Sequence, residues 1–345
     1  MDLLRREFVL GHFGFKGASP DQFYRFQWRW PQQPATYVAY RIGIALYQLV
    51  WNILVIVFWD DPRFYRPVDT TAKWPIYLSN WSFFFLTIYF LTAAISTVAH
   101  YMQMRRDKVS SSATEAVSFE LGNPASPKST SPGSPSATLL SQQEPTLPWY
   151  FKLTWLLQTV ALNAVLFVAM GYWFFEYDPA LEKLQVFTIH VHAVAAVLGI
   201  VDFFVVANPF RVLHFIYPVI YFTTYIVFTL IYYHSGGINP YGGREMYEDM
   251  IDWEDNVGVS VGMSFVFIVV LGPVLHLIYL GLYVIRRLVA GEISSSCIRC
   301  RGRGSGEGAS DDDHDNFVEE GRRELVDDQE NDGNKCCPTS EVNQV

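Results

Sequence analysis

Cysteine is rare in this sequence, and common motifs of cofactor chemistry are absent. Only four of the 345 residues are cysteine, and all lie near the C-terminus: Cys297, Cys300, Cys336 and Cys337. Because we expect this segment to face the reducing cytoplasm, structural disulfides are not expected. The sequence contains neither a phosphate-binding glycine loop nor an HExxH motif. Neither a metal nor an organic cofactor is therefore predicted.

The cysteine pair in "CIRC" is half of a usual zinc site, and the later "KCC" has poor ligand spacing for the other half. Cys297 and Cys300 follow a basic stretch at the end of the last apolar run. This position favours S-palmitoylation over metal binding, and a pair of unreactive thiols is the simpler alternative.

Charged residues are nearly absent from six long stretches, although they make up 17% of the chain. Each stretch is about 20 residues or longer, the length needed to cross ~30 Å of hydrocarbon. Backbone groups in lipid must bond to one another, and these stretches lack the alternation of barrel strands, so we predict helices. The predicted spans are 38–58, 76–102, 149–174, 184–207, 212–233 and 257–285.

The predicted fold class is all-α: a six-span transmembrane helical bundle with a disordered cytoplasmic loop and tail. The loop is rich in Ser, Pro and Thr, and acidic residues are concentrated in the tail, in "SDDDHDNFVEEGRRELVDDQEND". Such segments cannot bury enough apolar surface to offset their ordering entropy. We divide the chain into an N-terminal segment (1–36), two spans (37–108), the loop (109–147), four spans (148–287) and the acidic tail (288–345).

Lys and Arg gather in alternate connecting segments, which predicts the orientation. They precede the first span and follow the second, fourth and sixth, and the other loops have fewer. Because short basic loops stay in the cytoplasm, both termini of this integral membrane protein are predicted to be cytoplasmic. "FYRFQWRW" at 23–30 fits the lipid headgroup level rather than a nucleic acid. Membrane lipids are the predicted partners, and no signal peptide is expected.

The fourth predicted span carries the ionisable residues His190, His192 and Asp202. Such a group normally faces the bundle interior or a wet cavity and marks a functional site, with a neutral histidine bonded to a neighbouring helix as the alternative. Two positions apart on a helix, the histidines diverge by about 200° and cannot chelate one metal. Asp202 lies about 15 Å beyond His192. We expect it to be structural and to reach water, Arg211 or the "ANPF" turn.

A hydroxyl lies on another span, at a depth that differs from that of His192 by roughly 7 Å, a difference that a helix tilt can remove. Ser79, with Asn80 beside it, is about one turn inside the second span. A serine and an imidazole can form the nucleophile and base of an acyl-transfer site, whereas a hydroxyl bonded to its own helix is the simpler alternative. Ala196 and Gly199 share the His192 face, and their small size allows close helix packing or leaves room for an acyl chain.

The loop after the fifth span, "YYHSGGINPYGGREMYEDMIDWED", is predicted on the same side as Ser79. Its glycines and Pro240 allow tight turns over the site. His234 is a candidate for binding a polar head group, and an acidic, water-facing lid is the milder alternative.

Several blocks resemble the rolling stone family: "YLSNWSFFFLTIYFL", "TIHVHAVAAVLGIVDF" and "NPFRVLHFIYPVIYFTTYIVFTLIYY". The resemblance covers about residues 20 to 290. More distantly, it extends to the androgen-induced family of membrane hydrolases, which cleave fatty-acid esters of hydroxy fatty acids with a threonine and a histidine. That resemblance implies Ser79 in place of the threonine and His192 as the histidine, with His190 and His234 in supporting roles. The family pattern "N-H-x-x-H-T" is "T-I-H-V-H-A" here, so the first histidine is displaced by one position.

Two functions remain open. The first is a lipid-ester hydrolase that acts on an acyl ester, in which Asn80 or helix-end amides hold the oxyanion. The second is a non-enzymatic membrane protein that acts in cell-cell (myoblast) fusion through partner contacts, as the family resemblance implies. A transporter is disfavoured because the spans show little repeat symmetry and few charges along a path.

Overall fold

The structure is a computed structural model that describes residues 13–28, 34–59, 71–120, 146–179, 184–247 and 250–291. The predicted tail from residue 292 onward and residues 121–145 of the predicted loop lie outside this part of the chain. The described residues are mostly helical and contain no β-strand, only two isolated bridges. The predicted all-α class is confirmed.

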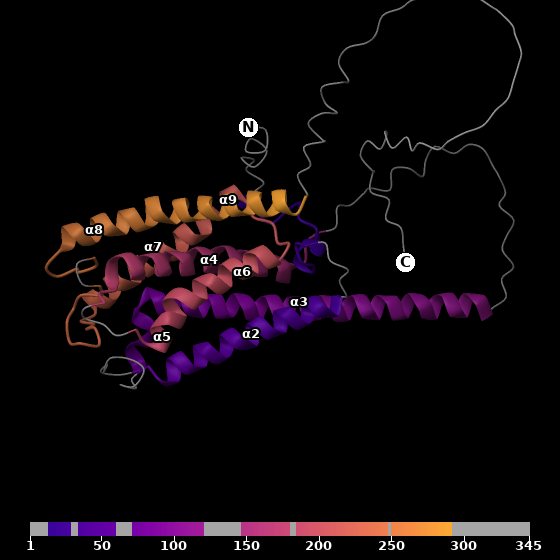
Figure 1. The fold of residues 1–345 in the computed structure, drawn as a ribbon, viewed down its shortest axis with the longest axis horizontal. Helices are drawn as coiled ribbons and strands as arrows, with labels where there is room; N and C mark the ends of the chain where they lie inside the picture. The colour runs from indigo at the N-terminus through magenta and orange to yellow at the C-terminus, as the bar shows by residue number, and fades with distance from the viewer. Residues whose placement is uncertain are drawn as a thin grey trace, which may run out of the picture. The chain divides into compact units, whose positions relative to one another are not determined.

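Within the part of the chain that the structure describes, six long, apolar helical segments make the bundle, as predicted (Figure 1). The first three consist of α2 (Pro34–Val57), α3 (Leu78–Glu120), and α4 (Trp149–Gly171) with the π-helical turn η4 (Tyr172–Glu176). The fourth joins α5 (Val186–Ile189), the π-helical turn η5 (His190–Val194) and α6 (Ala195–Val205). The fifth is the short 3-10 helix η6 (Val212–Phe215) with α7 (Ile216–His234), and the sixth joins α8 (Val257–Phe265), the π-helical turn η7 (Val266–Leu271) and α9 (Gly272–Val289). Their lengths and apolar composition identify an integral, multi-pass membrane protein.

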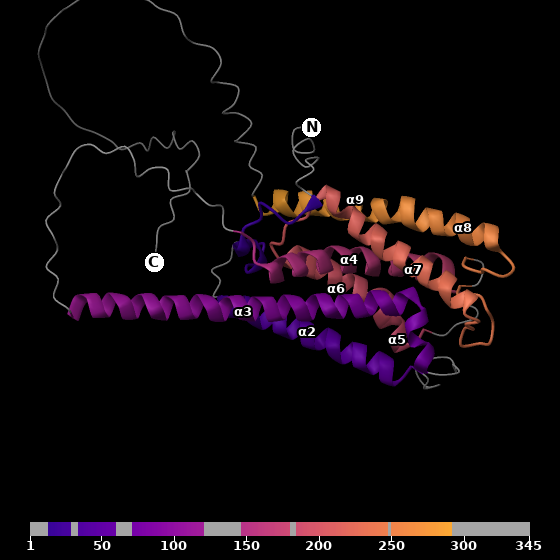
Figure 2. The same cartoon turned by 180° about the vertical axis from the view of Figure 1, so that it is seen from behind.

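Helix α4 lies at the centre of the bundle. It packs against α3, α6, α7 and α9, and Figures 1 and 2 show it between these helices from opposite sides. In the most apolar part of each segment, 67% of the residues are buried in α4 and η4, against 22% in the α8–α9 segment. A helix that is apolar all round is expected in such a central position.

Small residues allow α4 and α6 to approach closely. A Cβ atom added at Gly199 of α6 would lie 3.0 Å from Cδ2 of Leu162 and 3.4 Å from Cγ2 of Val165, both on α4. The small residues on the His192 face allow either close helix packing or room for an acyl chain. At Gly199 they allow close packing against α4.

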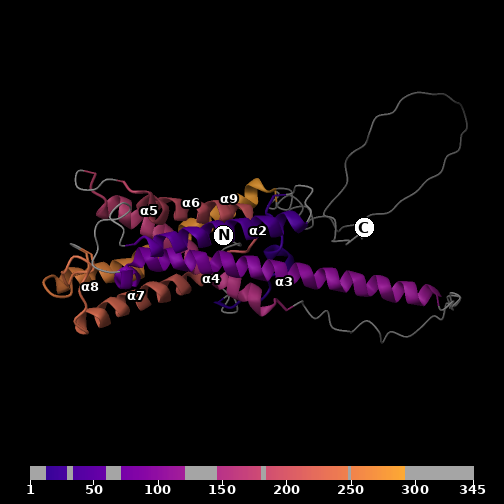
Figure 3. The ribbon, with the colours of Figure 1, turned by 90° about the horizontal axis from the view of Figure 1, so that it is seen from below.

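Helix α3 extends past the predicted end of the second span. It runs to Glu120, so the first part of the predicted disordered loop, 109–120, is helical (Figure 3). The sequence from 103 to 120 contains no glycine or proline, and the next such residues are Gly122 and Pro124. These are the residues at which a helix is expected to stop.

The two ends of the bundle differ in chemistry. We call the end with the start of α3, η4, the start of α5 and the α7–α8 loop (235–247 and 250–256) the loop end. The opposite end, with residues 13–28, the turn at 206–211 and the end of α9, is the basic end. There Arg211 donates from Nη1 to the backbone oxygen of Gly14 over 3.0 Å, and Gln27 N–H donates to Val205 O over 2.8 Å. Residues 13–28 are thus held against the end of α6 and the turn at 206–211.

Candidate active site

A cavity of about 540 Å³ opens between the helices at the loop end. This volume is in the range of small-molecule sites. Ser79 and Asn80 of α3 and His192 of η5 all line it. Its deeper wall is apolar and includes Phe167, Phe222 and Leu275, from α4, α7 and α9 respectively.

Three π-helical turns contribute to the cavity wall. They are η4, η5 and η7, each in a different membrane segment, and residues of all three line the cavity. A π-helical turn inserts a residue into the helix and redirects the side chains that follow, and such turns are frequent at functional sites. His192 lies within η5, so its direction depends on a distortion that helical periodicity does not predict.

One nitrogen of the His192 imidazole has a hydrogen-bond partner, which defines the tautomer of the ring. Its Nδ1 lies 3.0 Å from the backbone oxygen of Thr188. A carbonyl oxygen only accepts, so Nδ1 carries the proton, and in the neutral ring Nε2 is unprotonated. The ring also stacks on Tyr172, with centroids 3.8 Å apart. The side chain is therefore held with a proton acceptor, Nε2, available.

Ser79 lies in the first turn of α3 and is partly buried. Within the described residues its hydroxyl has no hydrogen-bond partner, and no hydrogen bond joins it to His192. Ser82, one turn further on, differs: its Oγ donates to Leu78 O over 2.9 Å and lies 3.2 Å from Tyr221 Oη. The bond back to the helix that we considered for Ser79 is thus made by Ser82 instead.

Asn80 lines the cavity, but its amide is engaged elsewhere. Nδ2 donates to the backbone oxygen of Trp74 over 2.6 Å, and the residue is 1% exposed. Beside it, Nε1 of Trp81 donates to Pro75 O. Both bonds hold the backbone of the turn before α3. Asn80 therefore stabilises the turn that precedes Ser79.

Two other candidate residues are not among those that line the cavity. His190 stacks on Trp51 of α2, and its Nε2 lies 2.8 Å from Oη of Tyr47. His234 is exposed at the end of α7, beside Tyr233. Ser79, Asn80 and His192 therefore line one cavity, whereas His190 and His234 are not among its lining residues.

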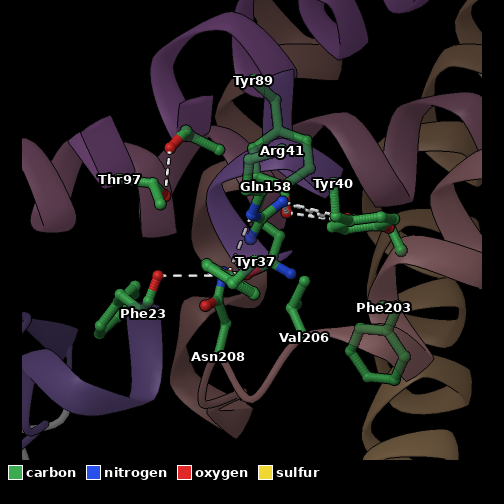
Figure 4. A network of polar contacts seen from close by, with 12 residues as sticks. Phe23, Tyr37, Tyr40, Arg41, Tyr89, Thr97, Gln158, Phe203, Val206 and Asn208 are labelled. Carbon is green, nitrogen blue, oxygen red and sulfur yellow. Dashed lines mark hydrogen bonds and ion pairs between the residues drawn. The ribbon is translucent and has the colours of Figure 1, made fainter. Parts of the chain in front are cut away.

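A buried ion pair between Arg41 near the start of α2 and Asp202 near the end of α6 lies towards the basic end, and Figure 4 shows its Arg41 with Tyr40 and Tyr89. Nη1 of Arg41 is 3.0 Å from Oδ1 of Asp202, and the side chains are 1% and 0% exposed. The hydroxyls of Tyr40 and Tyr89 donate to the same carboxylate over 2.8 and 2.5 Å. The charged partner of Asp202 is therefore Arg41 and not Arg211. A charge inside the first span was the signal in the sequence for this pair.

Comparison with known families gives a consistent picture. The family model described as "Protein rolling stone" matches residues 142–298. Protein rolling stone of Drosophila melanogaster is 27% identical over 286 residues, which cover 82% of this chain and 90% of that protein. No solved structure matches the chain. The chain is therefore a multi-pass membrane protein that is similar in sequence to Protein rolling stone over most of its length.

Proposed function

We propose that this protein is an intramembrane hydrolase of lipid (fatty-acid) esters, with Ser79 as nucleophile and His192 as general base and acid. One observation carries the proposal. A serine whose hydroxyl makes no other bond within the described residues and a histidine with a free Nε2 line the same cavity, although 113 positions separate them in the sequence. This is the pair of groups that acyl transfer needs.

The chemistry follows from these two side chains. Oγ of Ser79 attacks the acyl carbonyl while Nε2 of His192 takes its proton. The imidazolium then gives that proton to the departing alkoxide, which leaves an acyl-serine. Water hydrolyses this ester with His192 again as the base. The bond from Nδ1 to Thr188 O keeps the ring oriented and stabilises the imidazolium.

The form of the cavity supports an acyl substrate. Its deeper wall is formed by aromatic and aliphatic side chains, among them Phe167, Phe222 and Leu275, whereas Ser79 lies at the loop end. A lipid chain can lie along this wall with its ester near Ser79. The start of α3 also carries the positive end of the helix dipole, which favours negative charge developing there.

The proposal includes an orientation. Arg211, Arg286 and Arg287 belong to the basic end, and basic residues near short loops favour the cytoplasm. Both termini are then cytoplasmic, and the cavity lies in the exoplasmic half of the membrane. The competing hypothesis is a non-enzymatic role in cell-cell (myoblast) fusion, which does not require Ser79 or His192.

A fluorophosphonate probe tests the proposal on the purified full-length protein in detergent. We expect the probe to modify Ser79, identified by mass spectrometry, and expect Ser79→Ala and His192→Gln to abolish labelling. Ser82→Ala is the matched control, because its hydroxyl is buried and bonded within the fold. It should label like the unmodified protein. A folded protein that is neither labelled nor able to cleave fatty-acid esters would refute the hydrolase.

A further inference from the structure

The reaction proposed above needs a donor for the carbonyl oxygen, and the nearest candidates are engaged. Nδ2 of Asn80 donates to Trp74 O. In the first turn of α3, the Asn80 N–H donates to Tyr77 O over 3.1 Å. The N–H of Leu78 donates to a side chain, the hydroxyl of Tyr247, over 2.9 Å. The hydroxyl of Tyr247 therefore lies beside Ser79, bonded to the residue that precedes Ser79.

Tyr247 reaches this position from the α7–α8 loop. Its side chain lines the cavity with Ser79 and His192. The loop that carries it is held by an isolated bridge between Tyr247 and Ile251, and by Asn239, whose Nδ2 donates to Glu245 O over 3.1 Å. These bonds hold the loop, and the bond from Leu78 N–H holds the phenol at the start of α3.

The hydroxyl of Tyr247 has a proton to give. A phenol has one proton and also accepts, and here its oxygen accepts from Leu78 N–H. Tyr225 is its hydrogen-bond neighbour, but the proton of Tyr225 goes to Ile76 O over 2.9 Å. A carbonyl oxygen that gains negative charge is a much stronger acceptor than a phenol oxygen, so the Tyr247 proton can turn to the substrate.

We propose that Tyr247 is a third catalytic residue, whose hydroxyl donates a hydrogen bond to the ester carbonyl oxygen and to the oxyanion that forms from it. This inference rests on the proposed hydrolase function. As Ser79 Oγ bonds to the acyl carbon, the carbonyl π pair moves onto the oxygen beside Tyr247. When the pair returns, the ester C–O bond breaks and the alkoxide takes the proton held by His192. The proton of Tyr247 is shared but not transferred.

The ionisation of Tyr247 is compatible with this role. Burial raises the pKa of Tyr247 to about 12, with hydrogen bonds to its oxygen acting in the opposite direction. The phenol therefore stays protonated at neutral pH and remains a donor. Accepting the bond from Leu78 also polarises its O–H group and strengthens the bond that it donates.

The test is Tyr247→Phe in the full-length protein, assayed on a fatty-acid ester and on the thiono analogue, in which sulfur replaces the carbonyl oxygen. Loss of one oxyanion donor lowers kcat roughly 10²-fold or more, and we expect KM to change little. Sulfur accepts hydrogen bonds poorly, so the preference for the oxygen ester should shrink by a similar factor in the variant. A merely structural role would not change this preference.

Tyr232→Phe is the matched control. It removes a hydroxyl that donates to Ile238 O over 2.9 Å in the same region but is not among the cavity residues. This variant should keep the kinetics of the unmodified protein. Should Tyr247→Phe not fold, incorporation of difluorotyrosine at position 247 keeps the hydroxyl and lowers its pKa. Hydrolysis should then be lost at a lower alkaline pH than in the unmodified protein.

The outcomes separate the two proposals. A folded Tyr247→Phe variant with unchanged kcat and unchanged preference between the two esters would overturn the role of Tyr247, while loss of activity in Ser79→Ala would leave the hydrolase standing. An unmodified protein that neither labels nor cleaves esters would overturn both. An unchanged alkaline pH limit with difluorotyrosine would also count against Tyr247.

Discussion

Asp202→Asn should destabilise the bundle strongly, because it removes the charge that balances a buried arginine. The carboxylate of Asp202 accepts hydrogen bonds from Arg41, Tyr40 and Tyr89, and Arg41 is 1% exposed. Asparagine keeps one acceptor oxygen but no charge. The guanidinium of Arg41 then remains inside the protein without its counter-ion.

The expected cost follows from this geometry. Removing one partner of a buried ion pair costs about 3–5 kcal/mol, because the other charge is left uncompensated. Arg41→Met combined with Asp202→Asn leaves no buried charge. This double variant should therefore cost less than the two single variants together, by about 2 kcal/mol.

Reversible unfolding in mixed micelles, followed by tryptophan fluorescence and helical circular dichroism, measures these differences. Glu254→Gln is the control, since Glu254 and Arg244 form an ion pair of similar length, 3.1 Å, with side chains 44% and 38% exposed. It should cost less than about 1 kcal/mol. If Asp202→Asn and Glu254→Gln lower the free energy of unfolding equally, burial of the Arg41–Asp202 pair is not the reason for its contribution to stability.

Three further substitutions test the site and its packing. His190→Phe should preserve fluorophosphonate labelling of Ser79, because the ring stacks on Trp51 and is not among the cavity residues; loss of labelling in a folded variant would contradict this. Gly199→Leu should lower unfolding stability by about 1–3 kcal/mol, since the added atoms meet Leu162. Leu275→Trp should fill the deep part of the cavity and reduce the hydrolysis of long-chain esters more than that of short-chain esters. An unchanged dependence of the rate on chain length would show that the acyl chain does not lie along this wall.

The membrane segments could be predicted because their signal is compositional. A span must be about 20 apolar residues long whatever it packs against, so the absence of charge is sufficient to find it. The extension of α3 to Glu120 lies beyond the bilayer, where hydropathy carries no information. The local sequence does carry a signal there: residues 103–121 contain no glycine or proline, which favours a longer helix.

The candidate site could be predicted only in part. His192 was identified because an ionisable group in an apolar segment needs a reason to be there. Its neighbours depend on which helices adjoin and on three π-helical turns, which leave no periodic signal in the sequence. Tyr247 lies in a loop whose acids indicate exposure to water, and only the fold brings its hydroxyl to Leu78. Arg41 was missed despite a local signal, a charge within the first span.

The buried ion pair and the candidate site belong to the same membrane segment, and this suggests why the pair is present. An apolar replacement of a buried ion pair is often as stable, so its value is more often to fix one arrangement. Asp202 lies on α6 below η5, and its bonds to Arg41 of α2 and Tyr89 of α3 define the rotation of that segment. A shift of one residue would turn a side chain by about 100° and move His192 out of the cavity. We therefore expect Arg41→Met with Asp202→Leu to keep a stable helical bundle but lose fluorophosphonate labelling of Ser79. If this variant labels at the normal rate, the orientation of His192 is set by helix packing and not by the ion pair.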